Sequence, residues 1–224
     1  MFTEALLDFL TELKNNNNKE WFTGNKECYE RQVRTPALNF INAFQSELHK
    51  ISPHFLAIAK KTGGSLMRPY RDTRFSKDKT PYKTNLGIQF RHQMGKDVHA
   101  PGFYFHISPD DVFIGSGMWH PEPSALKNIR TLIDEAPSAW KKIRHNKVML
   151  KDFEFVGESL VNPPRGFSKD HPDIEDLKRK DFIVVASLSK DQLFDKNIVK
   201  EIAKQYKKTE PLMKFLCEAQ QLNF

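Results

Sequence analysis

The chain has 224 residues, of which 39% are hydrophobic and 28% charged, so it is long enough to bury a core of its own. Its two cysteines, Cys28 and Cys217, lie far apart and form no CxxC pair, which argues against a disulfide framework and against a structural zinc site. The formal net charge of +7 favours anionic partners, such as phosphates, nucleic acids or acidic metabolites.

Residues 1–62 are predicted to be helical. Ala5, Phe9 and Leu13 recur at every fourth position, as on the apolar stripe of an amphipathic helix. Thr35 followed by Pro36 marks the start of another helix, because proline suits the first helical position. The first residues include acids and lack the basic stretch of a signal peptide. No apolar run is long enough to span a membrane. Because the cysteines form no disulfide framework, we expect a reducing, cytoplasmic compartment.

Residues from about 64 to 117 are predicted to form an antiparallel sheet. The stretches NLGIQFRH and GFYFHIS both alternate apolar and polar positions, which is typical of strands with one buried face. A PDD turn then leads into a third stretch, VFIGSG. The alternation places Leu86, Ile88, Phe90, Phe103 and Phe105 on one apolar face, which we expect helices to cover.

The remainder of the chain is predicted to be rich in helices and loops, with one further strand at about 181–188. There the sequence DFIVVASL is dense in β-branched residues. Ile198, Ile202 and Tyr206 then mark the apolar stripe of a C-terminal helix. We therefore expect an α+β fold in a single domain, residues 1–224. Its antiparallel meander sheet would be packed on one face by N- and C-terminal helices.

The segment Met67–Thr84, MRPYRDTRFSKDKTPYKT, carries three arginines and three lysines but only two acids. Pro69 disfavours a helix and favours extended backbone at the residue before it, so we expect a strand followed by a loop. Strand parity would then gather a polar face that consists of Arg68, Tyr70, Arg74, Gln89, Arg91, Tyr104 and His106.

The same segment predicts an anion-binding site. The planar guanidinium group of arginine donates paired hydrogen bonds to phosphate and carboxylate groups. A neighbouring carboxylate, Asp72, is expected to hold one of the arginines in place. The alternative is a structural network of ion pairs on an exposed sheet face. The residues assigned to the anion site are Arg68, Arg71, Asp72, Arg74, Lys79 and Tyr82.

The stretch RPYRDTRFSKDKTPYKT resembles the signature of DUF2461, a widespread bacterial family that also occurs in fungi. Its members have about this length and carry an Arg-x-x-Arg-Asp-x-Arg-Phe motif followed by a lysine and a tyrosine. KEWFTGNKECYE, GFYFHISPDDVFIGSGMWHPEP and PRGFSKDHPDIEDLKRKDF are similar to the same family, so the resemblance spans most of the chain. It implies neither an activity nor a cofactor. It does imply a role in the fold or the ligand site for Arg68, Arg71, Asp72, Arg74, Phe75, Lys79 and Tyr82.

The sequence leaves three functions open. The first is a binding protein for a phosphorylated small molecule or a nucleotide. The second is an enzyme that acts on such a ligand, with His106 or Tyr82 as the acid or base. The third, which is less favoured, is a nucleic-acid-binding protein. A basic stripe that reached Lys141, Lys142 and Arg144 would support it.

Neither a cofactor nor a metal ion is expected. The sequence contains no phosphate-binding P-loop, no dinucleotide fingerprint and no G-x-S-x-G motif. Two histidines and a carboxylate, His106, His120 and Glu122, could be drawn as a metal-ligand set. Nothing in the sequence fixes the geometry of these three side chains, so we do not assign a metal to them.

Overall fold

The computed structural model describes residues 1–95 and 100–224 of the chain. Its N-terminal helices are α1 (Glu4–Asn15), α2 (Lys19–Gly24), α3 (Lys26–Tyr29), a π-helical turn (Glu30–Arg34) and α4 (Thr35–Ile51). The later helices are α5 (Pro123–Glu135), α6 (Pro137–Arg144), α7 (Lys147–Leu150), α8 (Ile174–Leu177), α9 (Lys190–Phe194), α10 (Ile198–Lys208) and α11 (Glu210–Ala219). Helix α4 ends at Ile51, because Pro53 favours extended backbone at Ser52.

The described residues form one antiparallel sheet of six strands in the order β1-β2-β3-β4-β6-β5. Its strands are β1 (Phe55–Leu56), β2 (Leu86–His92), β3 (Gly102–Ile107), β4 (Val112–Met118), β5 (Glu154–Val156) and β6 (Phe182–Ser187). The predicted meander is confirmed as β2, β3 and β4, in which Phe105 pairs with Ile88 and with Ile114. The predicted strand near the C-terminus is β6. The sequence did not predict β1 and β5, because strands this short have no periodic signal.

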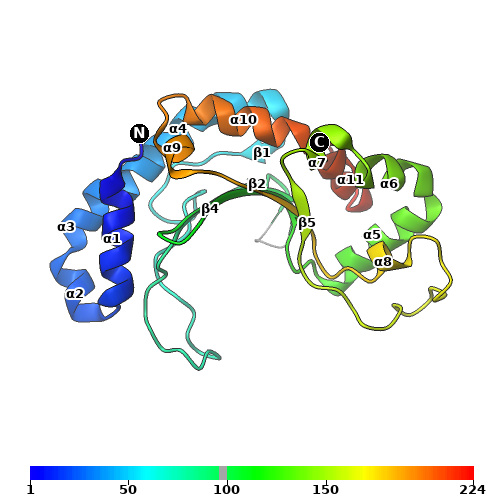
Figure 1. Cartoon of the computed structure of the whole chain (residues 1–224), viewed down its shortest axis with the longest axis horizontal. Coiled ribbons are helices and arrows are strands. Elements are labelled where there is room, and N and C mark those ends of the chain that lie inside the picture. Colours follow the sequence, from blue (N-terminus) through cyan, green and yellow to red (C-terminus); the bar gives the residue numbers. More distant parts are fainter. Residues whose placement is uncertain (96–99) are drawn as a thin grey trace.

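In the described part of the chain, helices cover one face of this sheet. The sheet is arched, and α4 and α10 lie over its convex side (Figure 1). Phe44 of α4 stacks on Phe90 of β2 with ring centroids 4.7 Å apart, and Tyr206 of α10 lies 4.8 Å from the ring of Phe103. Burying each such ring stabilises the fold by roughly 1.5–3 kcal/mol. The predicted α+β fold is confirmed, with N- and C-terminal helices on the apolar strand face.

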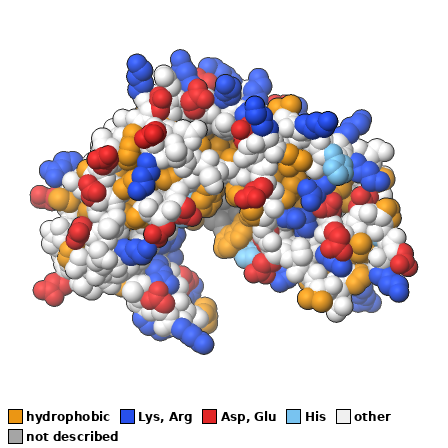
Figure 2. Space-filling model, in the orientation of Figure 1, with side chains coloured by type: hydrophobic (Ala, Val, Ile, Leu, Met, Phe, Trp, Pro, Cys, Tyr) orange, Lys and Arg blue, Asp and Glu red, His pale blue; other side chains and the backbone are white. Residues whose placement is uncertain are grey.

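Two helical flanks border the concave face of the sheet. Helices α1, α2 and α3 lie on one side of it, and α5, α6 and α8 lie on the other (Figure 1). Hydrophobic side chains gather in the hollow between the flanks (Figure 2). Trp140 of α6 is buried and donates from Nε1 to Asp176 Oδ2 at 2.9 Å, which ties α6 to α8. Within the described ranges, no helix is both long and apolar enough to cross a bilayer.

Residues 67–84, called the arm below, do not form the regular strand that was predicted. They leave the sheet as a long loop (Figure 1). At its base, the Arg71 amide donates to the Pro81 carbonyl oxygen at 2.9 Å, and the Lys83 amide donates to the Pro69 carbonyl oxygen at 2.7 Å. Both prolines lack the amide hydrogen that a longer ladder would need, so strand pairing stops there.

Candidate functional site

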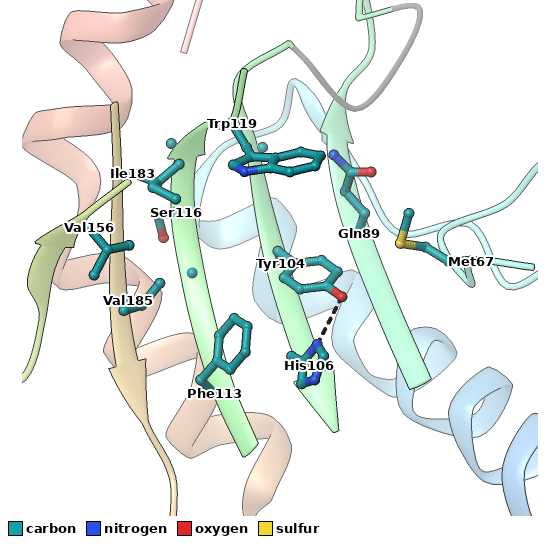
Figure 3. Close-up of a pocket in the computed structure, with 13 residues that line it drawn as sticks. Met67, Gln89, Tyr104, His106, Phe113, Ser116, Trp119, Val156, Ile183 and Val185 are labelled. Carbon is teal, nitrogen blue, oxygen red and sulfur yellow. Dashed lines mark hydrogen bonds between the residues drawn. The ribbon is translucent and has the colours of Figure 1, made fainter. Parts of the chain in front are cut away.

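The concave face of the sheet lines a cavity of about 410 Å³, called the groove below. Strand alternation explains its lining, because residues two apart on a strand point to the same side. Tyr104 of β3 lies opposite Gln89 of β2 and opposite Gly115 of β4. Ile183 and Val185 of β6 continue the same face (Figure 3). The groove therefore has an aliphatic side at β6 and a more polar, aromatic side at β2 and β3.

Two glycines of β4 shape the floor of the groove in different ways. A Cβ atom on Gly115 would lie 3.5 Å from the Val184 carbonyl oxygen and 3.6 Å from Val185 Cγ1, which are ordinary contacts. Gly117 has a φ of +132°, and a Cβ atom there would lie 2.0 Å from the Phe182 carbonyl oxygen. The backbone therefore requires glycine at position 117, whereas Gly115 leaves space above the floor that a side chain could fill.

Trp119 borders the groove where β4 ends, and 51% of its surface is exposed. The next residue fixes the turn. The His120 amide donates to Oδ1 of the buried Asp181 at 2.7 Å, and His120 Nδ1 lies 3.1 Å from the same oxygen. His120 has a φ of +46°, which few residues other than glycine adopt, so these two contacts hold an unfavourable backbone conformation. The indole ring thus sits at the mouth of the groove on a fixed turn.

A second cavity, called the basic pocket below, has a volume of about 440 Å³ and lies at the base of the arm. Four cationic side chains line it, those of Lys61, Arg68, Lys83 and Arg91, and none of its described lining residues is acidic. Burial and, after it, the positive charge of Arg68 lower the pKa of Lys83. Lys61 Nζ makes a loose contact with a carboxylate, at 3.8 Å from Glu30 Oε2. The pocket therefore concentrates positive charge.

The groove and the basic pocket adjoin, because Met67 and Gln89 line both of them. Backbone hydrogen bonds hold this shared wall in place. The Met67 amide donates to the Gly87 carbonyl oxygen at 3.0 Å, and the Gln89 amide donates to the Ser65 carbonyl oxygen at 2.8 Å. The two cavities thus form a composite site that is apolar and aromatic at one end and cationic at the other.

The arginines assigned to the anion site divide between this pocket and the arm. Arg68 lines the basic pocket. Arg74 instead donates to Asp72 from Nε at 3.0 Å and from Nη2 at 2.7 Å, so Asp72 does hold one arginine. Arg71 donates to Asp78 and to the hydroxyl group of Thr80. The structure therefore does not bring the three arginines together, and two of them tie the arm to itself.

Lys79 and Tyr82, the other assigned residues, also make contacts within the fold. Lys79 Nζ donates to the Thr73 carbonyl oxygen at 2.8 Å, inside the arm. Tyr82 is buried and stacks on Phe22 of α2, with ring centroids 4.0 Å apart and an angle of 15° between the rings. Neither side chain lines the groove or the basic pocket. Tyr82 is therefore poorly placed to act as an acid or base there.

His106, the other candidate acid or base, lies in the groove, as strand parity predicted for it together with Gln89 and Tyr104. Its Nε2 is 3.2 Å from Asp111 Oδ1, its Nδ1 is 3.2 Å from Tyr104 Oη, and its ring stacks on Phe113. Burial lowers the pKa of His106, although the charge of Asp111 acts in the opposite direction. Burial also raises the pKa of Tyr104 to about 12. Both side chains are therefore neutral near pH 7.

Two of the three side chains considered as a metal-ligand set contact different aspartates. His106 contacts Asp111, and His120 contacts Asp181. In residues 1–95 and 100–224, no group of three His, Cys, Asp or Glu side chains is arranged to hold a metal ion. Each of the two histidines is thus engaged with its own aspartate.

Comparison with known proteins identifies a family but no activity. No curated protein and no solved structure gives a significant match to the chain. One family model matches residues 5–215, and its description is "Conserved hypothetical protein (DUF2461)". Because this match covers all of the sheet, the arm and most of the helices, the chain belongs to the DUF2461 family.

Proposed function

We propose that this protein binds a phosphorylated small molecule with a flat apolar body, such as a nucleotide. The phosphate group would occupy the basic pocket, and the flat body would occupy the groove. The observation that carries the proposal is the wall shared by the two cavities, formed by Met67 and Gln89. One ligand can reach both cavities across it.

The basic pocket supports the phosphate end of this proposal. Arg68 and Arg91 provide guanidinium groups, whose planar forks match the oxygen atoms of a phosphate group. Burial is the main cause of the lowered pKa of Lys83, and repulsion by the positive charge of Arg68 adds to it. A bound anion relieves that repulsion, because an opposite charge nearby favours the charged form of lysine.

The groove supports the flat body of the ligand. Its volume of about 410 Å³ lies within the usual range of small-molecule sites, roughly 300–1,000 Å³. Gly115 leaves the floor open, while Trp119 and Tyr104 offer aromatic rings against which a planar group can stack. A cytoplasmic location is part of the proposal, and the free thiols of Cys28 and Cys217 are consistent with a reducing compartment.

Thermal unfolding with different anions tests this function. We expect AMP to raise the melting temperature more than inorganic phosphate does, and phosphate more than chloride at matched ionic strength, because a ligand that binds only the folded state stabilises it. Arg68→Gln removes a charge from the basic pocket and should reduce both shifts. Arg74→Gln is the matched control, since Arg74 belongs to the same motif but pairs with Asp72 in the arm.

Two outcomes would contradict the proposal. Equal melting temperatures in AMP, phosphate and chloride would mean that neither cavity binds its part of the ligand. An equal loss of the AMP effect in Arg68→Gln and Arg74→Gln would mean that the response reflects general surface charge and not the basic pocket.

A further inference from the structure

We propose that Asp111, His106 and Tyr104 form a proton relay that ends in the groove and activates a hydroxyl group of the bound phosphate ester. This inference rests on the proposed function, because it needs a phosphorylated ligand in the composite site. It adds a catalytic step to that binding. Tyr104 is the catalytic residue, since its hydroxyl group touches the ligand, and His106 and Asp111 act through it.

The geometry of the relay is continuous from the turn before β4 to the groove. Asp111 Oδ1 lies 3.2 Å from His106 Nε2. His106 Nδ1 lies 3.2 Å from Tyr104 Oη, the hydrogen bond that is dashed in Figure 3. Stacking on Phe113, with ring centroids 4.5 Å apart and an angle of 10°, fixes the plane of the imidazole ring. Ser108 donates to Asp111 Oδ1 and holds the carboxylate. All three relay members are therefore oriented before a ligand binds.

The partners of His106 determine where its proton lies. Asp111 offers an acceptor to Nε2, so Nε2 carries the hydrogen of the neutral ring. Nδ1 is then an acceptor, and it faces both the Tyr104 hydroxyl group and the Asn85 amide nitrogen, which lies 3.4 Å away. Tyr104 donates to Nδ1 in this tautomer. The Asn85 side chain also hydrogen-bonds to the Tyr104 hydroxyl oxygen, so one lone pair of that oxygen is left to accept a proton, as in a general base.

The hydroxyl group of Tyr104 lies beside the junction of the two cavities. A Cβ atom on Gly87 would be 2.8 Å from Tyr104 Oη and 2.9 Å from Met67 Sδ. Tyr104 Oη and Met67 Sδ therefore both lie close to the same point above Gly87. Met67 belongs to the wall that both cavities share. A hydroxyl group between the phosphate and the flat body of a ligand, as on the ribose of a nucleotide, would meet Tyr104 at this point.

The proton transfer balances within the relay. The ligand hydroxyl gives its proton to Tyr104 Oη while the Tyr104 proton moves to His106 Nδ1. The products are a ligand alkoxide and an imidazolium ion, so the net charge does not change. Asp111 stabilises the imidazolium ion across the Nε2 contact. The neutral resting state of His106, favoured by burial, leaves Nδ1 ready to accept.

A ribonucleotide probe that reports on its own hydroxyl group tests the relay. Uridine 3′-(para-nitrophenyl phosphate) carries a 2′-hydroxyl group next to an activated phosphate ester. Once that hydroxyl loses its proton, its oxygen bonds to phosphorus, and the bond from phosphorus to the nitrophenyl oxygen breaks. Nitrophenolate leaves with the electron pair and is measured by absorbance. The 2′-deoxy analogue cannot react in this way and gives the background.

We expect the full-length protein to release nitrophenolate from the ribonucleotide and not from the deoxy analogue. Tyr104→Phe should lower the turnover rate by about 100-fold, the lower end of the usual contribution of a general base, with an unchanged dissociation constant for AMP. Tyr70→Phe is the matched control. It makes the same chemical change at an exposed tyrosine of the arm that lines neither cavity, and it should leave the rate unchanged.

The pH profile distinguishes the relay from a structural hydrogen-bond chain. Among the described residues, the titratable groups in contact with His106 are Asp111 and Tyr104. The rate should fall as the pH drops through the pKa of His106, which lies below its ordinary value of 6.5. Asp111→Asn should move that midpoint lower still, because the charge of Asp111 raises the pKa of His106. A purely structural role for Asp111 would leave the midpoint in place.

Binding and catalysis can fail separately in these experiments. If AMP binds but the wild-type protein does not release nitrophenolate, or if Tyr104→Phe is as active as wild type, the relay is wrong and the proposed function stands. If the wild-type protein does not bind AMP, the proposed function is wrong and the relay with it.

Nitrogen NMR of the wild-type protein gives a test that needs no variant. A neutral His106 with its proton on Nδ1 at pH 7 would overturn the relay.

Discussion

At the scale of single residues, the two glycines of β4 predict opposite responses to the same substitution. Gly117→Ala should destabilise the fold by roughly 2–4 kcal/mol, because the new Cβ atom meets the Phe182 carbonyl oxygen and the backbone at position 117 has a positive φ. Gly115→Ala should change the free energy of unfolding by less than about 1 kcal/mol, since its Cβ atom makes ordinary contacts. It should weaken AMP binding by about tenfold by filling the floor of the groove. Urea unfolding and titration calorimetry measure the two effects, and similar losses of stability in both variants would contradict this account of the floor.

Residues on regular strands could be predicted from the sequence, whereas ion-pair partners could not. The period of two in β2 and β3 is enough to place Gln89, Tyr104 and His106 on one polar face. The partner of Arg71 depends on how the arm turns, and no periodicity describes that turn. Asp72 directly follows Arg71 in the sequence, yet Arg71 contacts Asp78, seven positions along the chain.

At the scale of elements, the arm should loosen in acid. Hydrogen bonds from Arg74 lower the pKa of Asp72 to about 2, and those from Thr80 and Arg71 lower the pKa of Asp78 to about 2, against an ordinary value of 3.8. A folded-state pKa below the unfolded one means that these contacts stabilise the arm above about pH 4 and are lost as the pH falls towards 2. The Arg74 amide, which donates to Asp72, should therefore lose protection from hydrogen exchange over this range.

A matched variant isolates the contribution of the carboxylate. In Asp72→Asn, protection of the Arg74 amide should already be reduced at neutral pH and should change little as the pH falls. The Thr80 amide, which donates to Asp78, should keep its acid response in that variant. Arg74 and Thr80 amides whose exchange does not change between pH 4 and pH 2 in the wild-type protein would show that these carboxylates do not order the arm.

At the scale of the whole molecule, the layer arrangement could be predicted but the composite site could not. Local periodicity gives the meander and the helices that cover it, because each pattern spans only one element. The basic pocket combines Lys61, Arg68, Lys83 and Arg91, which come from the loop after β1, both ends of the arm and β2. The Gly63-Gly64 turn and the position of Arg91 on the polar face of β2 were the available signals. Neither of these two signals shows that Lys61 and Lys83 lie beside Arg68 and Arg91, because their positions depend on the path of the arm.

The arrangement of the sheet also separates the two basic regions that a nucleic-acid interface would need to join. The basic pocket adjoins β2, whereas Trp140 of α6 packs on Phe155 of β5 and on Phe182 of β6. The strand order places β3 and β4 between these ends. Arg144 of α6 also pairs with Asp176, with Nε and Oδ1 3.1 Å apart, so part of the α6 charge is already neutralised. A continuous basic stripe from the pocket to α6 is therefore not favoured.

We accordingly expect only weak, salt-sensitive binding to duplex DNA. The net charge of +7 will attract phosphates at low ionic strength, but each neutralised phosphate releases counterions, so the affinity should fall steeply as salt is added. At physiological salt the dissociation constant should lie in the non-specific range, about 10⁻⁴–10⁻⁶ M. A filter-binding titration measures it, with Lys141→Gln as the control for the α6 charge. A dissociation constant tighter than about 10⁻⁷ M, weakened alike by Arg68→Gln and Lys141→Gln, would mean that the two basic regions act as one nucleic-acid surface despite the strands between them.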